Sequence, residues 1–187
     1  MAIYVTSDLH FCHNRPFLYE PRGFISIQEM NDAIIRNWNQ VVSDDDLVFI
    51  LGDIMLNDNE LGCKFFNQLK GDKVIILGNH DTDNRKELYR HLRGVNGLRS
   101  IKYADQIKYN GYNFYLSHYP TLTSRPDIKR PLNKILINLC GHIHTKDRFE
   151  DWDKGYIYHC ELDAHNMYPV LIDNIIKDIE EKYNGRL

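Results

Sequence analysis

The sequence lacks the features of a membrane protein, a secreted protein or a strongly basic nucleic-acid binder. No apolar run approaches the roughly 18 residues that a transmembrane helix needs, and the N-terminus has no basic and apolar regions of signal-peptide type. The formal net charge of −3 argues against a strong nucleic-acid surface. We therefore expect a cytoplasmic protein that does not contact membranes.

Cysteine is also scarce, and the four cysteines at positions 12, 63, 140 and 160 form no CxxC pair. A chain of 187 residues that is 43% apolar can build a core without disulfides, so we expect buried, reduced thiols. There is no internal repeat and no low-complexity linker. The length therefore predicts a single domain over residues 1–187.

What the sequence does contain is a series of apolar, strand-like runs that each end in a polar motif. The five motifs are Asp8-Leu9-His10, Gly52-Asp53, Gly78-Asn79-His80-Asp81, His118 and Gly141-His142-Ile143-His144. In open α/β sheets, ligands bind outside the carboxyl ends of the strands, so these motifs can converge on one cleft. If the chain is extended there, alternation would point Asp8 and His10 the same way, and likewise His142 and His144.

The remaining pattern alternates between helix and strand. Ser26 and Glu29 have capping-box spacing before an amphipathic helix over 27–42. Asn110-Gly111 is a two-residue hairpin signal. Further helices are expected at 59–70, 84–92 and 171–183, strands at 2–6, 73–77, 98–103, 106–109, 112–117, 135–140 and 156–160, and loops at 11–25 and 119–134. The pattern predicts an α/β protein with a mixed sheet.

The order of the five motifs resembles that of the calcineurin-like metallophosphoesterases, from Ile3 to about His144. The segments 7–14 and 163–170 are similar to a small bacterial and phage branch of predicted phosphoesterases. The resemblance implies a four-layer α/β/β/α sandwich with mixed sheets. It also implies a binuclear metal-dependent phosphoesterase that hydrolyses its ester by metal-bound hydroxide.

The resemblance further implies a role for each motif residue. Two divalent transition-metal ions would be bound, with Mn²⁺ as the first choice and Fe, Zn²⁺, Ni²⁺ or Co²⁺ as alternatives. His80 would contact a phosphate oxygen and protonate the leaving oxygen, and Asp81 would hold the other nitrogen of its ring. The first metal would be bound by Asp8, His10 and His144, the second by Asn79, His118 and His142, and both by the bridging Asp53.

Candidates for substrate contacts lie outside the five motifs. They are His13 and Asn14 just past the first motif, Arg125, Lys129 and Arg130 in the 119–134 loop, and His165 with Asn166. For each of them, a surface loop residue is the alternative interpretation. Gly52, Gly78 and Gly141 are interpreted as supports that let the chain turn off a strand.

The substrate class is less well determined than the metal site. A phosphodiester is favoured, because many small family members without a cap domain cleave diesters. A phosphomonoesterase, a nucleotide pyrophosphohydrolase and a non-catalytic protein-interaction scaffold remain alternatives, although the complete ligand set and His80 argue against the scaffold. The expected partner is a phosphorylated small molecule or nucleotide, and a homodimer stays open.

Overall fold

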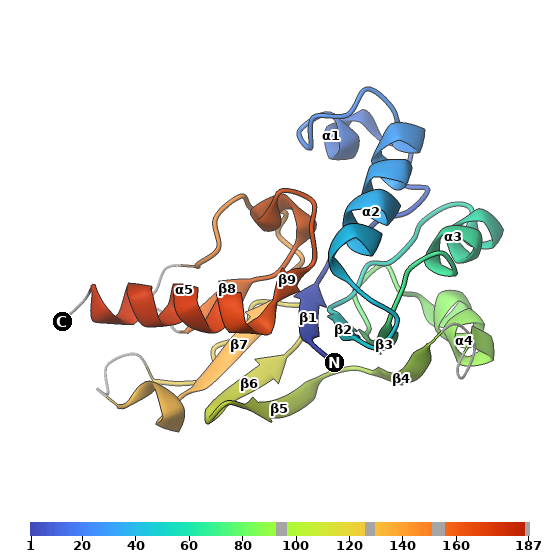
Figure 1. The fold of residues 1–187 in the computed structure, drawn as a ribbon. Coiled ribbons are helices and arrows are strands. Elements are labelled where there is room, and N and C mark those ends of the chain that lie inside the picture. Colours follow the sequence, from blue (N-terminus) through green and yellow to red (C-terminus); the bar gives the residue numbers. More distant parts are fainter. Residues whose placement is uncertain (93–96, 126–129, 151–155, 186–187) are drawn as a thin grey trace.

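The computed structural model describes residues 1–92, 97–125, 130–150 and 156–185, without the side chains of residues 91 and 92. Its helices and strands alternate along the chain before the later strands follow one another (Figure 1). The strands are β1 (Ile3–Thr6), β2 (Leu47–Ile50), β3 (Asp72–Ile76), β4 (Leu98–Lys102), β5 (Asp105–Tyr109), β6 (Tyr112–Leu116), β7 (Leu136–Cys140), β8 (Ile157–His159) and β9 (Val170–Leu171). The helices are α1 (Pro16–Tyr19), α2 (Ile27–Val41), α3 (Asn59–Phe66), α4 (Asp83–Leu92) and α5 (Ile172–Asn184), with 3₁₀ turns η1 (Leu132–Lys134) and η3 (Leu162–His165).

The strands form two mixed sheets, as the family resemblance implies, whereas the sequence pattern alone predicts an α/β protein with a mixed sheet. The first sheet has the order β4-β3-β2-β1-β9, and only the pairing of β9 with β1 is antiparallel. The second has the order β5-β6-β7-β8, in which β5 and β6 form an antiparallel hairpin and the other pairs are parallel. The carboxyl ends of β1, β2 and β3 therefore share one edge, and those of β6 and β7 share another.

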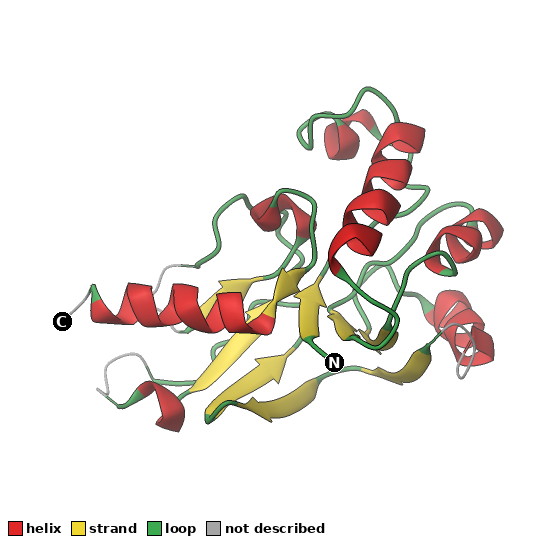
Figure 2. Ribbon diagram, viewed as in Figure 1, coloured by secondary structure: helices red, strands yellow, loops and turns green. Residues whose placement is uncertain are grey.

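Two apolar cores explain the layering. Along β2, Val48 and Ile50 face a core shared with α2 and α3, while Phe49 faces a core between the two sheets. This alternation is the ordinary consequence of the two-residue period of a strand. The helices lie on the outside of the sheets (Figure 2), and α5 adds its buried isoleucines, such as Ile175, to the second core.

Local sequence accounts for the boundaries of α2 and of the hairpin. The Ser26 side chain accepts a hydrogen bond from the Glu29 backbone amide, and the Glu29 carboxylate accepts one from the backbone amide of Ile25. This satisfies donors that the first turn of a helix otherwise leaves open. Asn110 and Gly111 both have positive φ, which the predicted two-residue turn requires.

Three elements differ from the sequence-based expectation. The loop predicted over 11–25 contains the short helix α1, which begins with proline at a position where proline is tolerated. Helix α3 ends at Phe66 rather than near residue 70, because Trp38 and Asn39 of α2 hydrogen bond to the following backbone at Lys70 and Gln68. The two-residue strand β9 is too short to carry a periodic signal.

The four cysteines are free thiols, of which only Cys63 is partly exposed. In the part of the chain that the structure describes, no helix combines the length and the apolar character needed to cross a membrane.

Candidate metal centre

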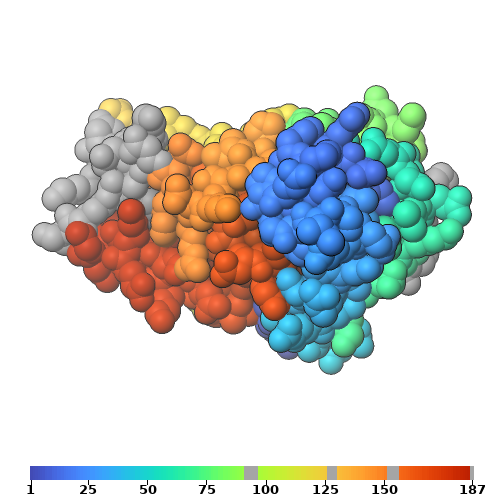
Figure 3. Space-filling view, turned by 90° about the horizontal axis from the view of Figure 1, so that it is seen from above, coloured from blue at the N-terminus to red at the C-terminus, as the bar shows by residue number. Residues whose placement is uncertain are grey.

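The five motifs meet where the carboxyl ends of the two sheets face each other. Seen from above, the N-terminal segment in blue lies beside the orange segments that follow β7 and β8 (Figure 3). Backbone hydrogen bonds extend the pairing of β1 and β2 past the strands, from Asp8 to Gly52 and from His10 to Asp53. The His142 amide donates to the Asp8 carboxylate across the sheets at 2.9 Å. The motifs are therefore joined by the fold itself.

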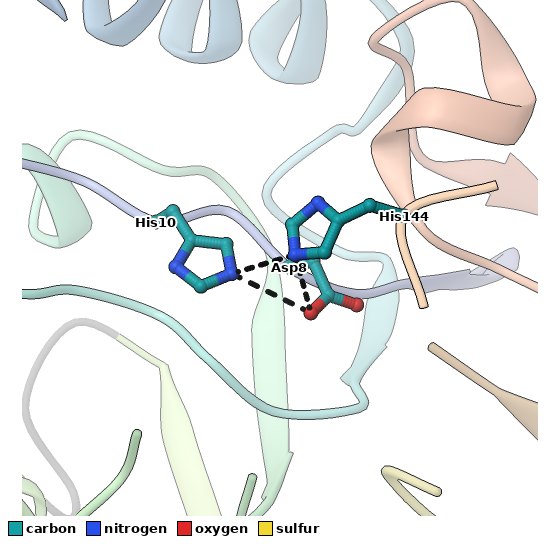
Figure 4. A group of neighbouring side chains, drawn as sticks. All are labelled: Asp8, His10 and His144. Carbon is teal, nitrogen blue, oxygen red and sulfur yellow. Dashed lines mark hydrogen bonds and ion pairs between the residues drawn. The ribbon is translucent and has the colours of Figure 1, made fainter. Parts of the chain in front are cut away.

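One group of three side chains places its donor atoms around a common point (Figure 4). The Nε2 atoms of His10 and His144 are 3.1 Å apart, and each lies 3.6 Å from Oδ1 of Asp8. Ligands that bind a metal at about 2.1 Å lie about 3–3.5 Å from one another. The group therefore has the spacing of a metal site.

A second group lies on the other side of Asp53. Oδ1 of Asn79 is 2.8 Å from His118 Nε2 and 2.9 Å from His142 Nδ1, and the two imidazole nitrogens are 3.2 Å apart. Oδ2 of Asp53 lies 3.6 Å from His118 Nε2 and 3.7 Å from His10 Nε2. The Asp53 carboxylate thus stands between the two groups, as a bridging ligand must. The structure brings together all seven predicted ligands.

The backbone conformation at the ligands differs from the expectation. Asp8 and His10 have φ values of 59° and 51°, and Asp53, His142 and His144 also have positive φ. The segments are therefore not extended, and simple alternation of faces is not what joins the pairs. Left-handed residues other than glycine cost about 1–3 kcal/mol each and cluster at functional sites. Tight turns at the ligands, rather than strand geometry, aim these side chains inward.

The three glycines before the ligands are needed mainly for close packing. Only Gly52 has positive φ, at 99°. A Cβ atom added to Gly78 would lie 2.2 Å from Oδ1 of Asp53, and one on Gly141 would lie 2.2 Å from Oδ2 of Asp8. The glycines therefore give the carboxylates room, and Gly52 also supplies the turn that was predicted for all three.

Burial sets the protonation of the ligands. It lowers the pKa of His10 to about 4 against the opposing effect of Asp8, and it also lowers the pKa of His142. For Asp8, burial raises the pKa, but His10 and the other nearby histidines outweigh it and lower the pKa below the ordinary value. Neutral imidazoles and an ionised carboxylate are the forms that bind metals.

The donor set fits a pair of divalent ions. Oδ1 of Asp8 is buried without a hydrogen-bond partner, although it faces two imidazole nitrogens. An unpaired buried carboxylate oxygen is costly, and a cation at this point would satisfy it. Burial, reinforced by Asp8, raises the pKa of Asp53 despite the opposing effect of His118.

His80 lies at the open edge of the ligand groups. Its side chain is 41% exposed, with Nε2 4.0 Å from Oδ2 of Asp53, and its backbone amide donates to Oδ1 of Asp53. Burial, followed by the charge of Arg85, lowers its pKa. The His80 imidazole is therefore a partly exposed ring beside the Asp53 carboxylate, open to a ligand from solvent.

Asp81 does not hold the His80 ring as expected. Within the described residues, its carboxylate accepts hydrogen bonds from the backbone amides of Gly78, Asp53 and Ile54 and from the Tyr89 hydroxyl. The carboxylate therefore holds the backbone on both sides of Asp53 in place and makes no hydrogen bond to the His80 ring among the described contacts.

Comparison with known proteins identifies the family. The model of the calcineurin-like phosphoesterases matches residues 1–156. The chain belongs to the calcineurin-like phosphoesterase family. Its members hydrolyse phosphoesters. Within the described residues of this chain, two clusters could hold a metal ion, namely Asp8 with His10 and His144, and Asp8 with Asp53 and His118.

Two relatives and one solved structure show how far this phosphoesterase resembles known proteins. It is 33% identical to the uncharacterized protein MJ1445 of Methanocaldococcus jannaschii, over 96% of this chain and 92% of that protein. It is 32% identical to the Gene 66 protein of Mycobacterium phage L5, over 75% of this chain and 76% of that protein. Its fold is similar to that of the protein of unknown function AQ665 from Aquifex aeolicus, with a TM-score of 0.70, 23% identity and coverage of 94% and 98% of the two chains.

Of the predicted substrate contacts in this phosphoesterase, His13 is the one that the structure brings to the site. Its ring centroid is 5.2 Å from that of His10 and 6.1 Å from that of His80, and its Nδ1 is buried without a partner. Burial lowers its pKa. Asn14 is exposed in the same turn, where its backbone amide donates to Cys12.

The other predicted contacts of the phosphoesterase lie elsewhere. Nε2 of His165 donates to the His159 carbonyl at 2.9 Å, and its ring stacks on Tyr158 in the body of the fold. Asn166 lines a surface groove together with His165. Arg125 follows Ser124, which is bonded to Leu136 at the amino end of β7, opposite to the ligands. Arg130 lines a groove beside α5. Lys129 lies outside the described residues.

Sequence reasoning missed one feature of the phosphoesterase site. Arg22 and Asp163 form a buried ion pair that contacts His144. Asp163 belongs to the second segment that resembles the bacterial and phage branch, but Arg22 lies in a loop with no pattern of its own. The two residues are 141 positions apart, so no local signal could pair them.

Proposed function

We propose that this phosphoesterase hydrolyses a phosphodiester with two divalent metal ions, Mn²⁺ in the first instance. The observation that supports the proposal is the convergence of two ligand groups on the bridging Asp53, with the exposed ring of His80 beside it. Asp8, His10 and His144 would hold one ion, and Asn79, His118 and His142 the other. When bound, two such ions supply Lewis acidity that makes water a nucleophile at neutral pH.

The protein's own groups would position and protonate the substrate. The His80 ring lies at the solvent edge, where its Nε2 can approach a phosphoryl oxygen and donate a proton to the leaving oxygen. His13, which has an unpartnered ring nitrogen near both His10 and His80, is placed to bind a second phosphoryl oxygen. General acid catalysis of this kind typically contributes about 10²–10⁴-fold.

The open rim of the site supports a diester rather than a monoester. His80 is exposed, and Tyr119, Ile143 and Phe17 are exposed apolar side chains in or next to the segments that carry His118, His142 and His13. A phosphate with an organic group on each side can contact this surface on both sides. A phosphomonoesterase or nucleotide pyrophosphohydrolase is the alternative within the same chemistry.

The test is a paired assay of metal-stripped protein reloaded with Mn²⁺. One arm uses bis-p-nitrophenyl phosphate and the other p-nitrophenyl phosphate. We expect faster turnover of the diester, and a loss of about 10²–10⁴-fold in His80→Ala with unchanged metal content. Preference for the monoester would favour the alternative. Wild-type turnover in metal-loaded His80→Ala would remove His80 from the mechanism, and silence in both arms despite metal binding would favour a scaffold.

A further inference from the structure

A buried ion pair links the segment between α1 and α2 to the turn η3. Nε of Arg22 donates to Oδ1 of Asp163 at 3.0 Å, and Nη2 donates to Oδ2 at 2.6 Å. The two side chains are 1% and 8% exposed. Such a two-point contact fixes the orientation of both groups as well as their distance.

This Arg22–Asp163 pair touches His144 on the side away from the ligand group. Oδ2 of Asp163 lies 3.2 Å from Nδ1 of His144, whereas Nε2 of the same ring faces Asp8 and His10. Nη2 of Arg22 also donates to the Asp8 backbone carbonyl at 2.9 Å. The pair is therefore attached to two members of the first ligand group without occupying their donor atoms.

The chemistry of imidazole ligands explains the contact between Asp163 and Nδ1 of His144. A histidine that binds a metal through Nε2 carries its proton on Nδ1, and that N–H needs an acceptor to fix the ring. Asp163 is the acceptor at hydrogen-bond distance. Nη2 of Arg22 is also 3.2 Å from Nδ1 of His144. When Nδ1 carries the proton, both atoms are donors and cannot hydrogen bond to each other, so Arg22 then donates to Asp163 and to the Asp8 carbonyl.

His144 needs such support more than its neighbours. Its side chain is 30% exposed, whereas His10 and Asp8 are 2% and 0% exposed and are held by surrounding atoms. Stability alone does not explain the pair, because buried ion pairs are often no more stabilising than apolar side chains of the same size. What the pair adds is a contact with His144, the most exposed member of the first ligand group.

We propose that Asp163 positions His144 for the first metal ion and that Arg22 positions Asp163. This inference rests on the metal-dependent function proposed above. It assigns the two residues as positioning groups that make the first site bind tightly, while the second site of Asn79, His118 and His142 does not depend on them.

The experiment is a titration of metal-stripped protein with Mn²⁺ by calorimetry, which resolves the two binding events. We expect Asp163→Asn to weaken one of them by about 10–100-fold and to leave the other unchanged. Arg22→Lys, which keeps the charge but only one contact, should fall between Asp163→Asn and the wild type. The matched control is Asp178→Asn, because Asp178 is also bound by an arginine, Arg148, and is partly buried at 19% exposure, but touches no ligand.

Equal affinities of wild type and a folded Asp163→Asn protein for both ions would overturn the inference. Should Asp163→Asn not fold, wild-type affinity in Arg22→Lys would overturn it instead, and selective weakening of one site would support it. Loss of both sites together, or the same loss in Asp178→Asn, would point to general destabilisation and would also overturn it. The titration measures metal binding without a substrate. A protein that binds metal as expected but hydrolyses no phosphodiester would therefore contradict the proposed function and not this inference.

Discussion

Asp81 offers the sharpest test of how the site is built. It is buried, and its Oδ2 accepts from the amides of Gly78 and Asp53 at 2.8 and 2.9 Å. Its Oδ1 accepts from the Tyr89 hydroxyl at 2.9 Å and lies 3.4 Å from the Ile54 amide. The geometry predicts that Asp81→Asn weakens the fold itself, before any effect on catalysis.

The magnitude follows from the four donors. The asparagine oxygen can keep the two short hydrogen bonds from the Gly78 and Asp53 amides. Each of these bonds becomes weaker by about 0.5–1.5 kcal/mol, because the acceptor is no longer charged. The new NH₂ group then faces the Ile54 N–H, whose loss of a partner costs about 1–3 kcal/mol. Tyr89 can turn its hydroxyl and accept instead. The sum is a loss of about 2–6 kcal/mol, or on the order of 10 °C in Tm for a chain of this size.

Urea and thermal unfolding of the metal-free protein measure this effect without a contribution from metal affinity. Tyr89→Phe is the control, because it removes one of the contacts and leaves the backbone amides bonded to Asp81, and we expect a smaller loss. The reasoning would be refuted by an Asp81→Asn protein that is as stable as the wild type but inactive. That result would instead indicate that Asp81 acts through the chemistry of His80.

Two further predictions concern packing and pH. Gly78→Ala would place a Cβ atom 2.2 Å from Oδ1 of Asp53 and force that carboxylate to move. We expect the affinity for Mn²⁺ to fall by about 10–100-fold, the loss typical when the support of a metal ligand is disturbed. A Mn²⁺ titration measures this loss, and the control is Gly62→Ala, whose nearest contacts are with the Met55 side chain and which should bind Mn²⁺ normally. Burial lowers the pKa of His165 from 6.5 to about 4, so the unfolded state takes up a proton that the folded state refuses, and stability should fall by about 3 kcal/mol as pH falls through this window. Urea unfolding at several pH values between 7.5 and 4 gives the free energy of unfolding as a function of pH. This free energy should fall less steeply with pH in His165→Gln than in the wild type, and the same pH dependence in both proteins would contradict the assignment.

The sequence was sufficient for the succession of helices and strands along the chain, and its motifs with the family resemblance were sufficient for the set of candidate ligands. Parallel strands carry apolar runs, and the polar ends of neighbouring parallel strands fall at one edge of their sheet. Asp8 and Asp53 after β1 and β2, and His118 and His142 after β6 and β7, are therefore neighbours that the pattern predicts. The Asn110-Gly111 turn was equally readable, because two residues with positive φ restrict the choice of amino acids.

The remaining features depend on contacts that no local pattern encodes. The left-handed turns at Asp8 and His10 are imposed by hydrogen bonds to the segment after β2. The inward turn of Asp81 depends on amides from two different strand ends. His165 was a candidate for the cleft because it follows a strand, but its ring packs against Tyr158 instead.

The left-handed backbone at the ligands bears on how such a site would decay. Asp8, His10, Asp53, His142 and His144 each hold a conformation that glycine would adopt with less strain. In a lineage released from selection for metal binding, replacements at these positions would stabilise the protein and would spread early. The candidate ligands would then be among the first residues to be substituted in a protein that is no longer selected for catalysis. Their joint presence in this chain favours a protein that is still in use as a catalyst.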